Sequence, residues 1–144
     1  MYLLKIATVP APAVSLQATV SQAVEAMMKH RVGAVAVVSD GALRGIFTER
    51  DVMGRVVAAR RDPASTTVEE VMTSQVESIP ETTKAVEALN LMVERHFRHL
   101  PITDGHGNLR GMLSVRNLLQ NQIEYLSHEL NGMEAYMTAD GIGG

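Results

Sequence analysis

The sequence has no cysteine and no tryptophan, and aromatic residues make up only 3% of it. The missing cysteine excludes a disulfide scaffold, a thiolate metal site and a cysteine nucleophile. The scarce aromatics leave no platform on which single-stranded nucleic acid stacks its bases. No apolar run is long enough to span a bilayer, and the short apolar start, broken by Pro10 and Pro12, does not form a signal peptide. We therefore expect a cytoplasmic protein that uses neither a membrane nor a nucleic acid as partner.

The composition is that of an ordinary globular domain. The chain has 144 residues, of which 46% are hydrophobic and 20% charged, so it is long enough for a sizeable core. Its net charge of −3 gives no excess of positive charge that would indicate binding to nucleic acid or to an anionic membrane. Nine methionines, with many valines, alanines and leucines, must fill the core in place of aromatic side chains.

One short motif occurs twice. Residues 45–52 read GIFTERDV, and residues 111–118 read GMLSVRNL. In each copy an apolar strand end runs into a hydroxyl residue, Thr48 or Ser114, at the place of a helix N-cap. Asp51 or Asn117 follows three residues later, in the first helical turn. Each copy is therefore predicted to form a strand-to-helix corner.

Such a corner suits a phosphorylated ribose. Free backbone N–H groups at a helix N-terminus attract phosphate, and a carboxylate accepts hydrogen bonds from ribose hydroxyls. The alternative for a single copy is an ordinary capped helix without a ligand. Two copies with matching surroundings favour a nucleotide-binding corner over an ordinary capped helix.

The motif belongs to a longer repeat, shifted by about 65 residues. Hydrophobic spacing predicts a β-α-β-β-α unit in each half, hence an α/β (α+β) fold. Strands are expected at 13–16, 34–38, 43–48, 76–79, 97–102 and 109–114, and the main helices open at Thr19, Glu49, Thr82 or Thr83, and Val115. The lead 1–12 is expected to lack regular structure. The expected divisions are 1–62, 63–122 and a C-terminal helix with a Gly-rich tail, 123–144.

On these residues the chain resembles a tandem pair of CBS domains, a Bateman module, over roughly residues 10–122, and in particular the small stand-alone bacterial proteins. The matching signature is Gly-hydrophobic-x-[Ser/Thr]-x-x-[Asp/Asn], present twice in register. The repeat itself predicts two units that pack sheet against sheet with pseudo-twofold symmetry and leave two related clefts, in agreement with this resemblance. The resemblance also implies regulatory binding of an adenine nucleotide, AMP first, with ATP or NAD(H) as alternatives, and no catalytic activity.

The resemblance further implies which residues bind the ligand. Thr48 and Asp51 would line one cleft, and Ser114 and Asn117 the other, with the Asp51 carboxylate on the ribose diol. Phosphate candidates are Arg50 and Arg116 at the helix starts and Arg98 and His99 before the Leu-Pro strand, where the first unit has the small Gly33. Leu16 and Ile79, in the segments 14–16 and 78–80, would flank adenine. A solvated edge for Arg98 and His99, and an outward helix charge for Arg50, remain alternatives.

Asn117 departs from the usual Asp of the signature. An amide oxygen still accepts a hydrogen bond, but it loses the charge-assisted bond, which is roughly twice as strong as a neutral one. The second cleft is therefore expected to bind more weakly or to prefer another nucleotide.

Other chemistry finds little support in the sequence. The histidines at 96, 99 and 106 straddle a strand and a turn, with no carboxylate or cysteine to complete a metal site. Glu49 and Asp51 are two residues apart on a helix, so they do not form an acid–base pair. We expect no metal and no enzymatic activity.

The last predicted helix carries an apolar stripe spaced 4, 3, 4, 3, 4, as in a coiled coil: Leu119, Ile123, Leu126, Leu130, Met133 and Met137. The stripe either lies on the body of a monomer or binds a partner chain, and Gly132 is expected to bend or break the helix. We expect a homodimer that signals through its assembly or an effector protein. The alternative is a dimeric scaffold with vestigial clefts.

Overall fold

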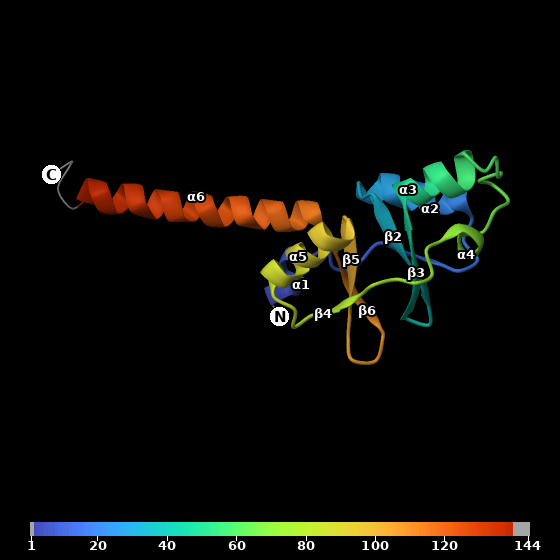
Figure 1. The fold of residues 1–144 in the computed structure, drawn as a ribbon, viewed down its shortest axis with the longest axis horizontal. Coiled ribbons are helices and arrows are strands. Elements are labelled where there is room, and N and C mark those ends of the chain that lie inside the picture. Colours follow the sequence, from blue (N-terminus) through green and yellow to red (C-terminus); the bar gives the residue numbers. More distant parts are fainter. Residues whose placement is uncertain (1, 140–144) are drawn as a thin grey trace.

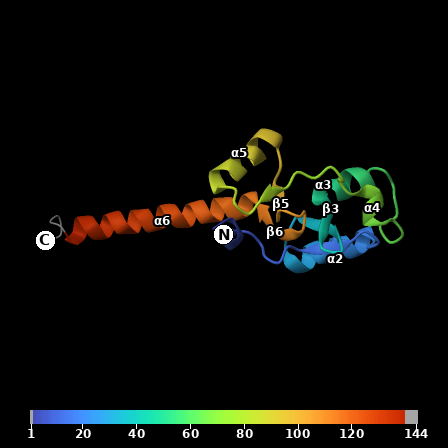
Figure 2. The same cartoon turned by 90° about the horizontal axis from the view of Figure 1, so that it is seen from below.

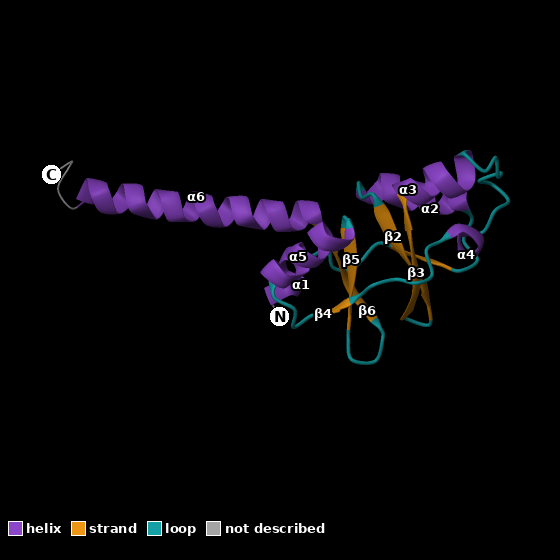
Figure 3. Ribbon diagram, in the orientation of Figure 1, coloured by secondary structure: helices purple, strands orange, loops and turns teal. Residues whose placement is uncertain are grey.

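The computed structural model describes residues 2–139 and contains two small sheets, each with its own helices (Figures 1 and 3). The strands are β1 Ala13–Ser15, β2 Ala34–Ser39, β3 Ala42–Thr48, β4 Ile79–Pro80, β5 His99–Thr103 and β6 Leu109–Ser114. The helices are α1 Tyr2–Ile6, α2 Val20–His30, α3 Glu49–Asp51, the π-helix η1 Val52–Val57, α4 Val68–Val71, α5 Ala85–Arg95 and α6 Val115–Ala139. The predicted mixed fold with two β-α-β-β-α units is confirmed.

The two sheets have the same topology. In the first, β1 pairs in parallel with β2, and β2 pairs antiparallel with β3. In the second, β4, β5 and β6 repeat this order and these directions. A parallel pair needs a crossover, which α2 and α5 supply, whereas a tight turn joins the antiparallel pair.

The run of small apolar residues in β2 explains how the sheets pack. Val35 and Val37 face the helices in the first core, whereas Ala34 and Ala36 lie between the sheets with Ile46 and Met112. All four β2 residues are fully buried, as expected for a strand covered on both faces. The small alanine side chains let the other sheet approach closely, which confirms the sheet-against-sheet packing.

The lead was predicted to lack regular structure, and this was wrong. Residues 2–6 form the short helix α1, and Leu3, only 1% exposed, lies in the core of the second unit. At the repeat shift of 65, α1 corresponds to α4, whose Val68 and Val71 fill the core of the first unit. Apolar burial of Leu3, Leu4 and Ile6 orders a segment whose later prolines had argued against structure.

The bridges beside these two helices show the same symmetry. Thr8 exchanges backbone hydrogen bonds of 2.9 and 3.0 Å with Met112, and Thr73 exchanges bonds of 2.9 and 3.0 Å with Ile46. Each unit is therefore completed by a helix and an extended residue that precede the other unit in sequence.

Helix α6 starts against α1 and α5 and then projects away from the body as a single rod (Figures 1 and 2). The predicted break at Gly132 does not occur, because α6 is continuous from Val115 to Ala139. A glycine in a helix costs only about 1 kcal/mol relative to alanine, so a single glycine does not by itself end a helix. Of the predicted loose tail, residues 140–144 lie outside the described part of the chain.

Candidate functional site

Both motif copies form the predicted corner, closed by a capping box. In the first, Thr48 Oγ1 accepts from the Asp51 backbone N–H at 3.2 Å, and Asp51 Oδ2 accepts from the Thr48 N–H at 3.0 Å. In the second, Ser114 Oγ accepts from the Asn117 N–H at 3.0 Å, and Asn117 Oδ1 accepts from the Ser114 N–H at 2.9 Å. The backbone geometry is thus shared, and the difference between the corners lies in what surrounds them.

The first corner is tightly packed. Asp51 is only 7% exposed and accepts a hydrogen bond from Thr73 Oγ1 at 3.3 Å. The Arg55 guanidinium lies 3.6 Å from the same carboxylate and donates to the Met72 carbonyl at 2.8 Å. The carboxylate predicted to meet a ribose is therefore already held by its own cap, a hydroxyl and a cation.

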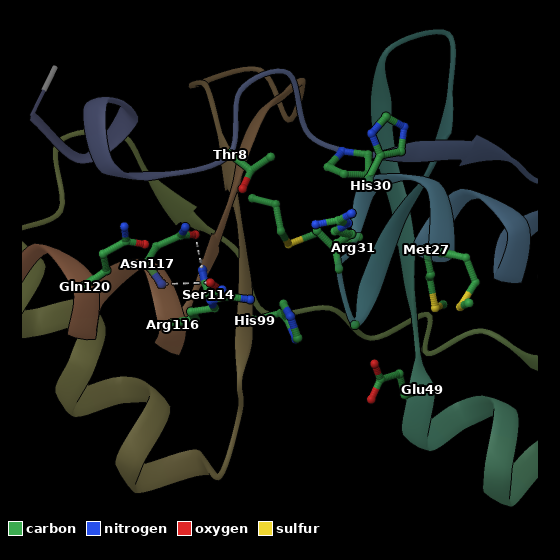
Figure 4. Close-up of a pocket in the computed structure, with 15 residues that line it drawn as sticks. Thr8, Met27, His30, Arg31, Glu49, His99, Ser114, Arg116, Asn117 and Gln120 are labelled. Atoms are coloured by element: carbon green, nitrogen blue, oxygen red, sulfur yellow. Dashed lines mark hydrogen bonds between the residues drawn. The ribbon is translucent and has the colours of Figure 1, made fainter.

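The second corner opens onto a cavity of about 750 Å³ between the two units (Figure 4). One wall comes from the end of α2 and the residues after it, and the other from β6 and the start of α6. The lining residues are Thr8, Pro12, Met27, Met28, His30, Arg31, Val32, Gly33, Glu49, His99, Met112, Ser114, Arg116, Asn117 and Gln120.

The cavity brings together five residues predicted from the sequence: Gly33, His99, Ser114, Arg116 and Asn117. They come from both units, as a shared cleft requires. The volume lies within the range of about 300–1,000 Å³ typical of small-molecule sites.

The other predicted residues lie elsewhere. Leu16 packs against the first core, and Ile79 is buried in the second, so neither lines this cavity. Arg50 and Arg98 are exposed and also lie outside its lining. The Arg98 backbone carbonyl accepts from the Val115 N–H at 2.9 Å and so helps to start α6.

Several lining residues were not found from the sequence, among them Thr8, His30, Arg31, Glu49 and Gln120. The repeat relates Thr8 to Thr73, but the role of this pair is visible only in the structure, where Thr73 donates a hydrogen bond to Asp51. Arg31 has the left-handed conformation, with φ of 54°, and its N–H caps α2. His96 also has the left-handed conformation, with φ of 60°, and its backbone N–H caps α5.

His99 is half-buried near the middle of the cavity. Burial lowers the pKa of its imidazole below 6.5, and Arg98 acts in the same direction, whereas Glu49 opposes the shift. A Cβ placed on Gly33 would lie 3.0 Å from Glu49 Oε1 and 3.4 Å from His99 Cε1. The missing side chain at Gly33 therefore makes room for an acid and a base from opposite units.

Residues 2–139 contain no cluster of three or more His, Asp or Glu side chains placed to hold a metal ion. Within the same residues, no helix combines the length and apolarity needed to cross a membrane.

The sequence has relatives among known proteins. It is 36% identical over 124 residues to the mitochondrial CBS domain-containing protein CBSX3 of Arabidopsis thaliana. The aligned segment covers 83% of this chain and 60% of CBSX3. It is 37% identical over 110 residues to the CBS domain-containing protein YhcV of Bacillus subtilis, covering 76% of this chain and 77% of YhcV. The chain thus spans less than two thirds of CBSX3 but most of YhcV.

A solved structure agrees with both. A putative signal-transduction protein with CBS domains from Burkholderia ambifaria superposes with a TM-score of 0.74 at 35% identity, over 79% of this chain and 83% of that one. The family model described as the CBS domain matches residues 5–58 and again residues 68–124. The two matches begin near α1 and α4, in line with the repeat seen in the structure, and the chain therefore belongs to the CBS-domain family as a tandem pair.

Proposed function

We propose that this protein is a non-catalytic regulatory module that binds an adenine nucleotide, AMP before ATP or NAD(H), in the cavity between its two units. The observation that carries the proposal is the position of Ser114, Arg116 and Asn117 at the start of α6, with His99 beside Ser114 on β5, all facing Gly33 of the first unit across one cavity. The N–H groups and positive dipole at the start of a long helix, beside a guanidinium, favour phosphate.

Two structures of the same fold support the choice of ligand. The CBSX2 protein and the PAE2072 protein of Pyrobaculum aerophilum have each been solved in complex with AMP, at 21% and 23% identity to this chain. At that identity the likeness shows the fold alone. The case for AMP here therefore rests on the cavity, and the complexes agree with it.

We further propose that the protein forms a homodimer and that an effector protein recognises this dimer. The stripe residues Leu119, Ile123, Leu126 and Leu130 are 52%, 64%, 56% and 56% exposed, so the body of their own chain does not cover them. The side chains of Met133 and Met137, predicted to extend the stripe, lie outside those the structure describes. A second copy of α6 would bury the exposed part by coiled-coil packing.

A thermal scan tests nucleotide binding. A ligand present at about 100 times its dissociation constant adds about 2.7 kcal/mol to the stability. For a chain of this size we expect AMP to raise the melting temperature by about 5–10 °C. Arg116→Gln should reduce the rise, whereas Arg44→Gln, an exposed arginine outside the cavity, should not.

Thermal scans with a panel of ligands distinguish the nucleotide-binding function from the scaffold alternative. Wild-type protein scanned with AMP, ATP, NADH and S-adenosylmethionine should respond to at least one adenine nucleotide. No shift with any of them would favour the dimeric scaffold with vestigial clefts.

A further inference from the structure

We infer that Thr8 belongs to the nucleotide site: its hydroxyl binds the sugar hydroxyls of a ligand held at Asn117. The inference rests on the proposed function and adds a residue from the lead, which precedes the first unit in sequence but completes the cleft at the second corner. It names an intact ribose as the part of the nucleotide that the lead recognises.

The backbone of Thr8 is fixed at the edge of the cavity. Its N–H donates to the Met112 carbonyl at 2.9 Å, and its carbonyl accepts from the Met112 N–H at 3.0 Å. A Cβ placed on Gly111 would lie only 3.3 Å from the Thr8 carbonyl oxygen and 3.0 Å from Val9 Cγ2, so the glycine of the motif lets the lead cross β6 closely. The half-buried Thr8 lines the cavity.

The first unit shows what a threonine at this position contacts. Thr73, the repeat counterpart of Thr8, exchanges the same pair of backbone bonds with Ile46, and its hydroxyl lies 3.3 Å from Asp51 Oδ1. The motif glycine is equally tight there, since a Cβ on Gly45 would lie 2.9 Å from the Thr73 carbonyl oxygen. The shared backbone geometry therefore places the Thr8 hydroxyl beside the asparagine of the second corner.

The two threonines differ in their hydrogen bonds. Thr73 donates to the carboxylate, whereas the Thr8 hydroxyl has no hydrogen-bond partner among the described residues. Figure 4 shows Thr8 and Asn117 on the same side of the cavity, with His30 and Arg31 opposite them. A sugar bonded to Asn117 then lies within reach of the Thr8 hydroxyl.

The chemistry of this pair suits a diol. The amide of Asn117 is a weaker acceptor than the usual carboxylate, because charge-assisted hydrogen bonds are roughly twice as strong as neutral ones. The Thr8 hydroxyl can donate one hydrogen bond and accept others, and so can each hydroxyl of a ribose. A second polar group beside Asn117 thus strengthens the hold on the sugar without placing a negative charge near the phosphate.

Titration of the full chain with AMP, followed by the amide NMR shifts of Gly33 and Gln120, tests the inference. Thr8→Val keeps the side-chain shape but removes the hydroxyl, so it should weaken AMP binding by about 2- to 10-fold, as expected for one neutral hydrogen bond. Thr8→Ser keeps the hydroxyl and should bind AMP as the wild type does. The control Thr82→Val, at an exposed threonine outside the cavity, should also bind like the wild type.

An analogue without the diol separates the sugar from the rest of the ligand. The affinity for 2′,3′-dideoxy-AMP should be the same in the wild type and in Thr8→Val. Unchanged AMP binding by Thr8→Val, or an equal loss of affinity for AMP and for the analogue, would overturn the inference. An equal loss of AMP affinity in Thr8→Ser and Thr8→Val would also overturn it, because the hydroxyl would then contribute nothing. Wild-type protein whose amides respond to no adenine nucleotide would instead refute the proposed function.

Discussion

At the scale of single residues, Asp51 and Asn117 hold the same position at the start of their helices, yet Asp51 is held by Thr73 and Arg55 whereas Asn117 lines a cavity. The shared capping boxes follow from local sequence, since a hydroxyl residue with an Asp or Asn three residues later closes such a box. The partners of Asp51 do not follow from local sequence. Thr73 is 22 residues away, and only the packing of the two units brings it to the carboxylate.

His99 carries a prediction at this scale. Because burial lowers its pKa below 6.5, the imidazole stays neutral in the folded state at a pH where the unfolded chain already binds a proton. Stability must therefore fall as the pH drops below about 6.5 toward the folded pKa. The neighbouring charges are Glu49 and Arg98, with His30, Arg31 and Arg116 in the same cavity.

We expect His99→Gln to lose less stability than the wild type between pH 8 and pH 5.5, because glutamine does not titrate. Melting temperatures measured at intervals over this range give the comparison, and subtracting the two curves cancels the other titrating groups. A constant difference, or a wild type that gains stability in acid relative to the variant, would show that the folded state does not disfavour the His99 imidazolium.

At the scale of elements, most of the helices and strands could be predicted from hydrophobic spacing and capping residues. The exceptions are instructive. Helix α1 was missed because a five-residue helix has little intrinsic stability, and only its tertiary contacts with the second core order it. The π-helix η1 was predicted as an ordinary helix, since the shift of its hydrogen bonds to i+5 leaves no clear mark in the sequence.

We therefore predict that truncating a buried side chain of α1 strongly lowers the stability of the protein. Leu3→Ala removes a side chain that is 1% exposed, and buried Leu→Ala changes cost about 2–5 kcal/mol. Urea denaturation should show a loss in this range, with Val86→Ala, an exposed apolar position on α5, as the near-neutral control. A loss for Leu3→Ala no larger than that of the control would mean that α1 contributes nothing to the second core.

At the scale of the whole molecule, the repeat predicted two units, their sheet-against-sheet packing and two related clefts. A cleft was predicted at each corner, but Arg31 and Glu49 were not predicted to line the one at Asn117, because these side chains differ from their repeat counterparts. Leu16, partly buried against the first core, and Ile79, buried in the second, both lie outside the lining of this cavity.

The projecting helix α6 carries a prediction about assembly. Replacing Leu126 and Leu130 by glutamate puts charge into the exposed stripe, so a dimer held by α6 should dissociate at concentrations where the wild type is dimeric. Light scattering over a dilution series measures this. Tyr125→Glu, next to the stripe and 58% exposed, is the matched control and should leave the mass unchanged. A monomeric wild type would contradict the proposed homodimer, and a double variant that dimerises as tightly as the wild type would show that α6 does not hold it together.

The central claim is that an adenine nucleotide binds between the two units at the start of α6. A crystal structure of the protein grown with saturating AMP tests it most directly. The account predicts density for AMP in the cavity, at the start of α6 and in contact with Ser114, Arg116 and Asn117. An empty cavity under these conditions, or AMP bound only at another surface, would contradict it.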